Sequence, residues 1–383
     1  MNLINNPTKS TQYLDITSGA VVKDVWRSIT ANTVREASLR AHELNSFYFA
    51  PNPANYSPVL SGLIPIPPRT IWMFGEGACD LFFNPLSNSF TRDHELDFNG
   101  VCKKILSVIN SSNLAVEVSG GLDTSIIISL LREADLNPAL IGFSYPHYEF
   151  RTEMYLQNIF CNGASKHRLL KSNAGLPYKD ILKAPSHPIP NKASLFFARH
   201  KATAEAAHDM EVSLILNGIG ADALLCDAVQ SNGMPYSFHR SNINDEWPNE
   251  FIFQPLGCEY VSAVTLTPIS KLVYRLRRGA CEDSKKLWAR NFFSKILPLE
   301  LSRFAYKGAH DAVYQEGIEE MIPLLDELGN VAYSVTKNEL LKPDKLKRLA
   351  SDPGHASHEE TVFLMARISY CVWIYGLIRD GII

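Results

Sequence analysis

The stretch from Val116 to Ser125, VEVSGGLDTS, carries residue types suited to bind a phosphorylated ligand. Its two adjacent glycines and flanking hydroxyls let backbone N–H groups approach an anion closely, and the helix expected from Thr124 directs the positive end of its dipole at the same point. Asp123 supplies an oxygen ligand for Mg2+. The pattern therefore predicts a pyrophosphate-binding loop, with these candidate residues: Val118, Ser119, Gly120, Gly121, Asp123, Thr124 and Ser125.

Two better-known phosphate-binding patterns are absent from the sequence. A Walker A loop requires GxxxxGK[ST], and a Rossmann fingerprint requires GxGxxG after its first strand. Neither occurs at this position, where the string is SGGLDTS. The loop therefore predicts a nucleotide site of a different kind.

The elements around the loop alternate between strand and helix. Apolar runs at 114–118, 139–145, 167–171 and 212–217 predict strands, and the segments 124–134, 149–163 and 194–208 predict helices. Such alternation is typical of a parallel sheet with helices on both faces. Beyond residue 260 the pattern becomes helical, at 268–279, 283–296, 309–327 and 358–379. We expect an α/β fold with a helical C-terminal region.

A smaller N-terminal part precedes this core. Residues 21–45 predict a helix, six prolines mark residues 50–70 as a connector, and TIWMF and CDLFF predict a hairpin around Gly75 to Gly77. We expect a small N-terminal subdomain at 1–95, and a larger α/β domain at 96–383.

Composition excludes several classes of protein. The net charge of −3 argues against a nucleic-acid partner, and the seven scattered cysteines form no CxxC pair. The apolar run at 362–378 contains Arg367, which favours a buried helix over a membrane span. The start of the chain lacks the layout of a secretory signal. These features predict a cytoplasmic protein that binds no membrane.

With the SGGLD loop, three further segments resemble the asparagine synthetase class of PP-loop ATP pyrophosphatases. These enzymes bind ATP through SGGxDS and cleave it to AMP and pyrophosphate. The further segments are LNGIGADALL (216–225), TPISKLV (267–273) and the stretch from Lys286 to Pro298, which is similar to K-x-x-L-R-x-x-x-x-x-x-L-P. They occur in the family's order, so the resemblance implies that residues 96–383 form an ATP-binding synthetase domain with a sheet of adenine nucleotide alpha-hydrolase (PP-loop) type.

The resemblance assigns roles to individual residues. ATP and Mg2+ are the implied cofactors, with Asp123 and Asp222 as metal ligands. Lys307 lies where the family carries its catalytic lysine, and Glu259 is the carboxylate that family position favours as a base. A solvated Glu is an equal alternative for Glu259, as is a plain strand-end turn for the adenine-contacting Ser144. The remaining candidate nucleotide contacts are Gly218 and Gly220.

Departures from the family narrow the expected reaction. Asn2 stands where asparagine synthetases carry a nucleophilic cysteine, so the N-terminal subdomain resembles a remnant of the glutaminase half, and glutamine is not the expected nitrogen source. Relatives without glutaminase activity, the β-lactam synthetases and lasso peptide macrolactam cyclases, become the closer models. Their base is a Tyr at the position of Ile219, and an isoleucine cannot take a proton.

The expected function is therefore an AMP-forming amide-bond synthetase that makes a lactam or macrolactam in specialised biosynthesis. Its partners would be a small-molecule or peptide carboxylate and amine, with a precursor peptide and its protease in a lasso system. Three alternatives stay open: an ammonia-dependent asparagine synthetase-like enzyme, a PP-loop enzyme that modifies tRNA, and a non-catalytic nucleotide-binding homologue. The last is suggested by Ile219 and by Ala223, which replaces the family's usual Glu.

Overall fold

The computed structural model describes most of the residues beyond 113 and selected segments before it. The described residues are 2–6, 12–15, 21–22, 26, 29–39, 63–66, 70–75, 78–83, 113–146, 151–188, 190–226, 247–263, 273, 285–303, 311–351 and 358–383.

A five-stranded, all-parallel sheet forms the centre of the fold. Its strand order is β11–β10–β7–β8–β9, with bounds Glu259–Ser262, Leu214–Asn217, Leu114–Glu117, Ala139–Ser144 and His167–Lys171. The chain runs outward from β7 to β8 and β9, then returns to the other side of β7 for β10 and β11. The strand order therefore reverses beside β7. In open parallel sheets, ligands bind outside the carboxyl ends of the strands at such a point, which is where the SGGLD loop begins.

The α/β class and the parallel sheet expected from the sequence are confirmed. β7 is buried along its whole length, as an apolar run covered by helices on both faces should be. The fifth strand, β11, was not predicted, because its four residues, EYVS, include two polar side chains and give too short an apolar run to stand out.

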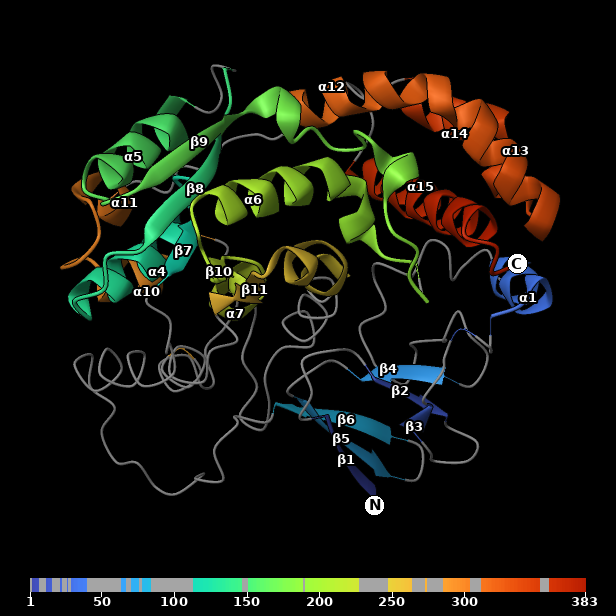
Figure 1. The fold of residues 1–383 in the computed structure, drawn as a ribbon, viewed down its shortest axis with the longest axis horizontal. Helices are drawn as coiled ribbons and strands as arrows, with labels where there is room; N and C mark the ends of the chain where they lie inside the picture. The colour runs from blue at the N-terminus through green and yellow to red at the C-terminus, as the bar shows by residue number, and fades with distance from the viewer. Residues whose placement is uncertain are drawn as a thin grey trace.

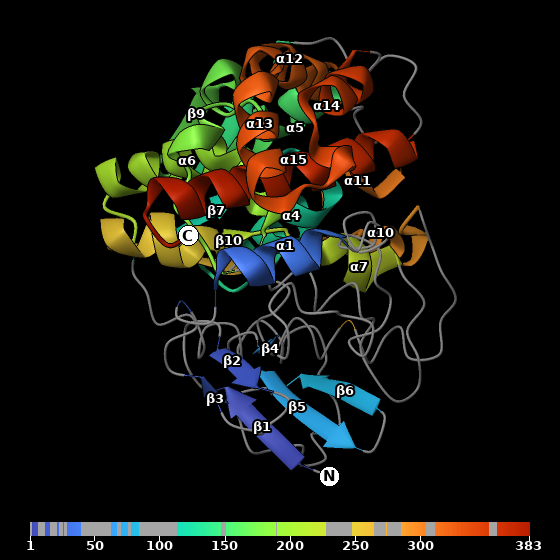
Figure 2. The same cartoon turned by 90° about the vertical axis from the view of Figure 1, so that its right-hand side faces the viewer.

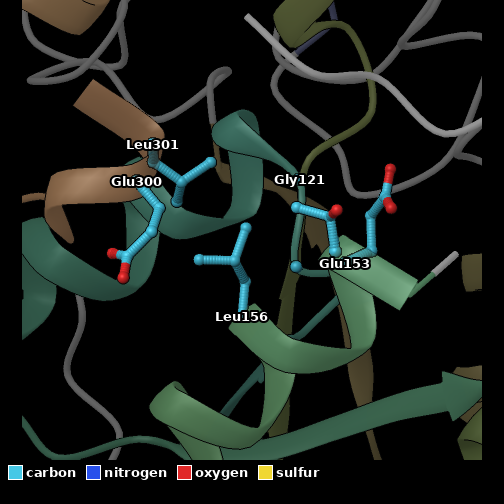
Figure 3. Close-up of a pocket in the computed structure, with 7 residues that line it drawn as sticks. Gly121, Glu153, Leu156, Glu300 and Leu301 are labelled. Atoms are coloured by element: carbon cyan, nitrogen blue, oxygen red, sulfur yellow. The ribbon is translucent and has the colours of Figure 1, made fainter. Parts of the chain in front are cut away.

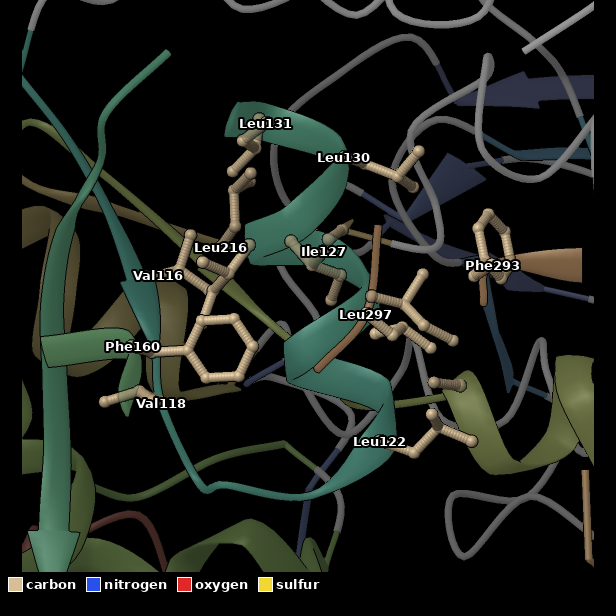
Figure 4. Close-up of a cluster of buried hydrophobic side chains, with 14 of the residues drawn as sticks. Val116, Val118, Leu122, Ile127, Leu130, Leu131, Phe160, Leu216, Phe293 and Leu297 are labelled. Carbon is tan, nitrogen blue, oxygen red and sulfur yellow. The ribbon is translucent and has the colours of Figure 1, made fainter. Parts of the chain in front are cut away.

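Helices pack on both faces of this sheet. On one face α4 (Leu122–Glu133) and α5 (Arg151–Asn162) pack against β7 with Ile127, Leu131 and Phe160, as Figure 4 shows. The other face is covered by α6 (Phe197–Asp209), which lies in front of the strands in Figure 1 and packs through Phe197 and Ala204. Burial of these apolar side chains on both faces is the main force that holds the layers together.

A second core lies in the C-terminal helices, to the right of the sheet in Figure 1. The helices are α12 (Asp311–Met321), α13 (Leu325–Thr336), α14 (Pro343–Ala350) and α15 (His358–Arg379). An N-terminal helix, α1 (Ala31–Leu39), joins them: Val34 is fully buried, and the Tyr370 hydroxyl donates a hydrogen bond of 3.2 Å to its carbonyl oxygen. The second core is thus built from both ends of the chain.

The remaining N-terminal strands form two antiparallel sheets, at the bottom of Figure 2. One contains β1 (Asn2–Asn6), β5 (Thr70–Gly75) and β6 (Ala78–Phe83), and the other contains β3 (Val21–Val22), β2 (Gln12–Asp15) and β4 (Leu63–Ile66). The predicted hairpin of TIWMF and CDLFF is confirmed as β5 and β6.

The predicted helix at 21–45 is wrong at its start. Val21 and Val22 pair with β2 as a strand, which suits two β-branched side chains, and the helix begins only at Ala31. Thr30 and Thr33 explain this start, because the Thr33 backbone N–H donates to the Thr30 hydroxyl at 3.2 Å and the Thr30 N–H to the Thr33 hydroxyl at 2.9 Å.

The C-terminal helices partly match the sequence prediction. The helix at 358–379 is confirmed and buried around Ile368 to Ile374. Among the described residues of the segment expected at 283–296, only Leu287–Phe292 are helical. The helix expected at 309–327 is interrupted at Ile322–Leu324, where Pro323 removes a backbone donor. All but one residue of 268–279 lies outside the described residues. Among the helices that the structure describes, none is both long enough and apolar enough to span a bilayer.

The imidazole of His200 is buried on the sheet-facing side of α6 and predicts a pH-dependent stability. It makes edge-on contacts with Phe253 and Tyr260, at 6.3 and 5.7 Å between ring centroids. Burial, aided by the positive charge of Arg199, lowers the pKa of His200 to about 3. The unfolded chain takes up this proton near its ordinary pKa, so folding holds one proton fewer between about pH 6.5 and 3.

We therefore expect His200 to reduce the free energy of unfolding as pH falls through that window, by about 1.4 kcal/mol per pH unit at most. Urea unfolding of wild type and His200→Phe between pH 7 and 4 measures it: the variant should lose stability less steeply. His167→Gln, on the exposed strand β9, is the control and should follow wild type. Parallel curves for wild type and His200→Phe would contradict the prediction.

Candidate functional site

The loop after β7 has the backbone that its two glycines were expected to provide. Gly120 has a φ of 76°, a left-handed conformation that glycine adopts without strain. A Cβ at this position would lie 2.1 Å from the carbonyl oxygen of Glu153 in the first turn of α5, so only glycine fits. The loop is thus pressed against α5, and α4 begins at Leu122.

Hydroxyl groups brace the turn internally. The Ser119 and Thr124 side-chain oxygens are 2.9 Å apart, the Gly121 N–H donates to the Ser119 hydroxyl at 3.2 Å, and the Ser125 hydroxyl donates to the Gly121 carbonyl at 2.7 Å. Under the loop, the buried amide of Gln157 donates to the carbonyl oxygens of Val118 and Phe143, at 2.9 and 3.0 Å. These bonds hold the loop and the ends of β7 and β8 in one arrangement.

The second glycine loop, which follows β10, lies against the start of α4. A Cβ on Gly218 would be 3.1 Å from the Thr124 methyl group and 3.6 Å from the Asp123 Cβ. Gly220 has a φ of 82°, which lets the chain turn into α7 (Ala221–Cys226) and places Asp222 in its first turn. Two loops far apart in the sequence therefore meet at the carboxyl edge of the sheet.

Asp123 and Asp222 converge on one ammonium group, that of Lys286. Its Nζ lies 2.5 Å from the Asp123 Oδ1 and 2.6 Å from the Asp222 Oδ1. The Lys286 side chain is 10% exposed, against 22% and 62% for the two aspartates. Burial lowers the pKa of Lys286, but the two carboxylates outweigh it, so the net shift is upward and the group is charged at neutral pH.

The segment around α10 (Leu287–Phe292) fixes the position of Lys286. The buried guanidinium of Arg290 donates to the carbonyl oxygens of Lys285 and Leu301, which joins the start of α10 to α11 (Leu299–Arg303). The Trp288 indole N–H donates to the Leu225 carbonyl at 2.9 Å, which ties α10 to α7. Lys286 is therefore held between the two glycine loops by elements on either side of it.

A pocket of about 380 Å³ lies beside the first glycine loop. Gly120 and Gly121 form one wall, and residues of α5 and α11 form the others. Figure 3 shows Leu156 and Leu301 pointing toward one another across its apolar floor, with the carboxylates of Glu153 and Glu300 on opposite sides. The volume is within the range of small-molecule sites, about 300 to 1,000 Å³.

The aspartate pair fits a divalent cation that arrives with a phosphorylated ligand. Among the residues that the structure describes, no group of three His, Cys, Asp or Glu side chains could hold a metal ion alone. Mg2+ is usually held by one or two carboxylates together with phosphate oxygens and water. Asp123 and Asp222 provide two such carboxylates, and their shared contact with Lys286 shows that the space between them favours positive charge.

The predicted site residues fall into three groups. The structure brings together the residues of both glycine loops and the two aspartates, and it places Ser144 at the carboxyl end of β8, on the same edge of the sheet. Glu259 is not brought to them. It is the first residue of β11 and is in register with Leu214, so it lies at the amino end of the parallel strands. Lys307 lies outside the described residues.

Two residues near the loops were not among the predicted ones. Lys286 is the first residue of the K-x-x-L-R-like segment, but no local pattern in the sequence reveals which carboxylates a lysine will contact. Asn217, the last residue of β10, is fully buried, and its Oδ1 accepts a hydrogen bond of 2.9 Å from the Ile219 N–H. Its Nδ2 has no hydrogen-bond partner among the described residues. The sequence feature that could have identified Asn217 is its position as a polar residue at the end of an apolar strand.

No protein-family model matches this chain, and no curated protein matches it in sequence. The geometry of the two glycine loops and the four sequence motifs are therefore the features that indicate a function.

Proposed function

We propose that this protein is an ATP-dependent amide-bond synthetase that releases AMP and pyrophosphate. A substrate carboxylate would be adenylated and then attacked by an amine. The supporting observation is the convergence of Asp123 and Asp222 on Lys286, beside the SGGLD loop and at the point where the strand order reverses. That combination provides backbone donors, two metal-ligating oxygens and a cation at one edge of a parallel sheet.

Each of these groups has a role in adenylation. The N–H groups around Gly120 and Gly121 would bind the β- and γ-phosphates, helped by the dipole of α4. Asp123 and Asp222 would hold Mg2+, which when bound neutralises the triphosphate charge. Lys286 would then move from the carboxylates to the departing pyrophosphate, whose negative charge grows in the transition state. The internal hydroxyl bonds of Ser119 and Thr124 keep the loop preorganised for this ligand.

The pocket beside the loop suits an amine nucleophile. Its leucine floor accepts an apolar carbon skeleton, and the carboxylates of Glu153 and Glu300 attract a protonated amine from either side. One of these carboxylates can also receive the proton that the amine must lose before attack. Glu259 lies at the amino end of the parallel strands, away from the glycine loops, so it is not proposed as the base.

The finer assignment follows the family resemblance. The strand order and the SGGLD loop support a sheet of PP-loop type, with the N-terminal strands as a small subdomain related to the glutaminase half. Within that class, we propose a lactam or macrolactam former in specialised biosynthesis, with ATP and Mg2+ as cofactors. The acidic, partly apolar pocket favours a substrate amine over ammonia.

Product analysis tests the proposal without knowledge of the natural substrate. The purified protein would be incubated with ATP, Mg2+, a panel of carboxylic acids and hydroxylamine as a general nucleophile. We expect AMP, pyrophosphate and a hydroxamate in equal amounts with at least one acid. Stoichiometric ADP would remove the protein from this class. Binding of ATP with no turnover on any acid would instead favour the non-catalytic alternative.

A further inference from the structure

A charged cluster on the α6 face of the sheet takes no part in the nucleotide site described above. It consists of Arg199 on α6, Glu117 at the end of β7, Tyr145 just after β8, and Tyr260 on β11, and we call it the Arg199 cluster. Glu117 comes two residues before Ser119, and Tyr145 follows the candidate adenine contact Ser144. The cluster therefore lies at the same carboxyl edge as the glycine loops, on the face opposite α4.

The guanidinium of Arg199 is incompletely paired. Its Nη1 donates to the Tyr145 hydroxyl at 3.1 Å, and its Nη2 lies 3.4 Å from one oxygen of Glu117. A full arginine–carboxylate pair has two parallel bonds of about 2.7–2.9 Å, so this contact is loose and one-sided. The second Glu117 oxygen accepts a hydrogen bond of 2.8 Å from the Tyr260 hydroxyl. Three of the five guanidinium N–H donors therefore have no hydrogen-bond partner among the described residues.

Arg199 is both deep in the fold and accessible. Burial is the strongest influence on its pKa and acts to lower it, although Tyr145, Glu117 and Tyr260 together raise the net value. Nevertheless 31% of its side chain is exposed. A cation in low-dielectric surroundings that a solute can still reach is suited to bind an anion, because charge interactions are strong where water is scarce.

Aromatic side chains surround the cation and indicate what kind of anion fits. The guanidinium lies 5.0 Å from the centre of the Phe143 ring. The half-buried ring of Tyr314 on α12 is close enough for the charge of Arg199 to act on its pKa, and it meets Phe196 edge-on at 6.1 Å. Phe143 is fully buried, so the partly exposed rings of Tyr314 and Phe196 are the ones that could contact an apolar or aromatic carbon skeleton with one negative group.

We propose that the Arg199 cluster is the binding site for an organic carboxylate with an aromatic or apolar skeleton. The inference rests on the proposed function, since it names the acyl substrate of that reaction: its carboxylate would meet Arg199 next to the glycine loop. Asn217 supports this location. Register places it beside Glu117 on the same face, where its buried Nδ2 is a further donor without a partner among the described residues.

Binding of 3-phenylpropionate in the absence of ATP tests the proposal, with 3-phenylpropionamide as its uncharged analogue. The paired substitution Glu117→Gln/Arg199→Gln removes both charges, because loss of Arg199 alone would leave a buried carboxylate uncompensated. Arg168→Gln is the control: Arg168 forms a 2.6 Å ion pair with Asp209 on the outside of the fold. Urea unfolding establishes that each variant is folded, and ligand-observed NMR titration gives the affinities.

Wild type and Arg168→Gln should bind the carboxylate at least about tenfold more tightly than the amide, since a hydrogen bond between two charged groups is stronger than one to a neutral group. The folded double variant should bind both probes equally weakly. The proposal is overturned if wild type shows no preference for the carboxylate, if the double variant keeps that preference, or if pyrophosphate displaces the probe, which would assign the cluster to nucleotide. None of these outcomes depends on ATP cleavage, so the proposed function can fail separately.

Discussion

Asp123→Asn should reduce the rate of pyrophosphate release at least about a hundredfold, the usual effect of removing one preorganised charged group from a transition state. The substitution keeps the shape of the side chain but removes the charge that would hold Mg2+ at the loop. Because the side chain lies in the first turn of α4 and is 22% exposed, the fold should survive. Hydroxamate formation, measured with the acid that gives turnover in wild type, provides the rate.

Asp344→Asn is the matched control for this substitution. Asp344 lies in the first turn of α14, its side chain is 69% exposed, and its ion pair with Lys345 is long, at 3.9 Å. We expect this variant to turn over at the wild-type rate. If Asp123→Asn kept more than about a tenth of wild-type activity at every Mg2+ concentration, the metal would not be bound at this carboxylate, and the roles of Asp222 and Lys286 would need reassignment.

Gly120→Ala should cause the second large effect, a loss of both stability and nucleotide binding. An alanine at this φ costs about 1–2 kcal/mol in any context. At Gly120 its methyl group would also lie 2.1 Å from a backbone oxygen of α5, which cannot rotate away as a side chain would. Overpacking of this kind adds about 1–3 kcal/mol, and relief of the clash would displace the loop that is proposed to bind phosphates.

Gly257→Ala separates the two causes. Gly257 has a φ of 78°, nearly that of Gly120, but a Cβ there would meet nothing within 4 Å. Urea unfolding of both variants should therefore give a small loss for Gly257→Ala and a loss larger by about 1–3 kcal/mol for Gly120→Ala. ATP binding, measured by calorimetry, should weaken only in Gly120→Ala. Equal losses of stability in the two variants would mean that α5 moves aside without cost.

The sequence predicts the parts of this site that depend on local pattern. The loop of Gly120 and Gly121 between an apolar strand and a helix can be recognised from consecutive residues, because small side chains and helix polarity act over short distances. The positions of Asp123 and Asp222 follow from the rule that parallel strands end at one edge. Both aspartates were therefore expected near each other, and their shared contact with Lys286 agrees with this.

Contacts between distant segments could not be predicted in the same way. Lys286 reaches the aspartates only because Trp288 and Arg290 hold its segment against α7 and α11, and no spacing in the sequence encodes that arrangement. Glu259 was expected near the loops because family position favoured it. The short strand β11 instead starts at Glu259, which places this residue at the amino end of the parallel strands, away from the loops. The Arg199 cluster joins residues from four segments that are far apart in the sequence. No pattern within any one of these segments predicts the cluster.

The second hydrophobic core has a consequence for synthesis of the protein on the ribosome. Val34 near the start of the chain and Ile368 near its end are buried in the same cluster. Val34 can therefore meet its partners in α15 only after more than three hundred further residues have been translated. The parallel sheet has all its strands by Ser262 and can begin to form earlier, so the two cores would be completed at different times. A long nascent chain whose second core is still incomplete is the kind of species that chaperones bind.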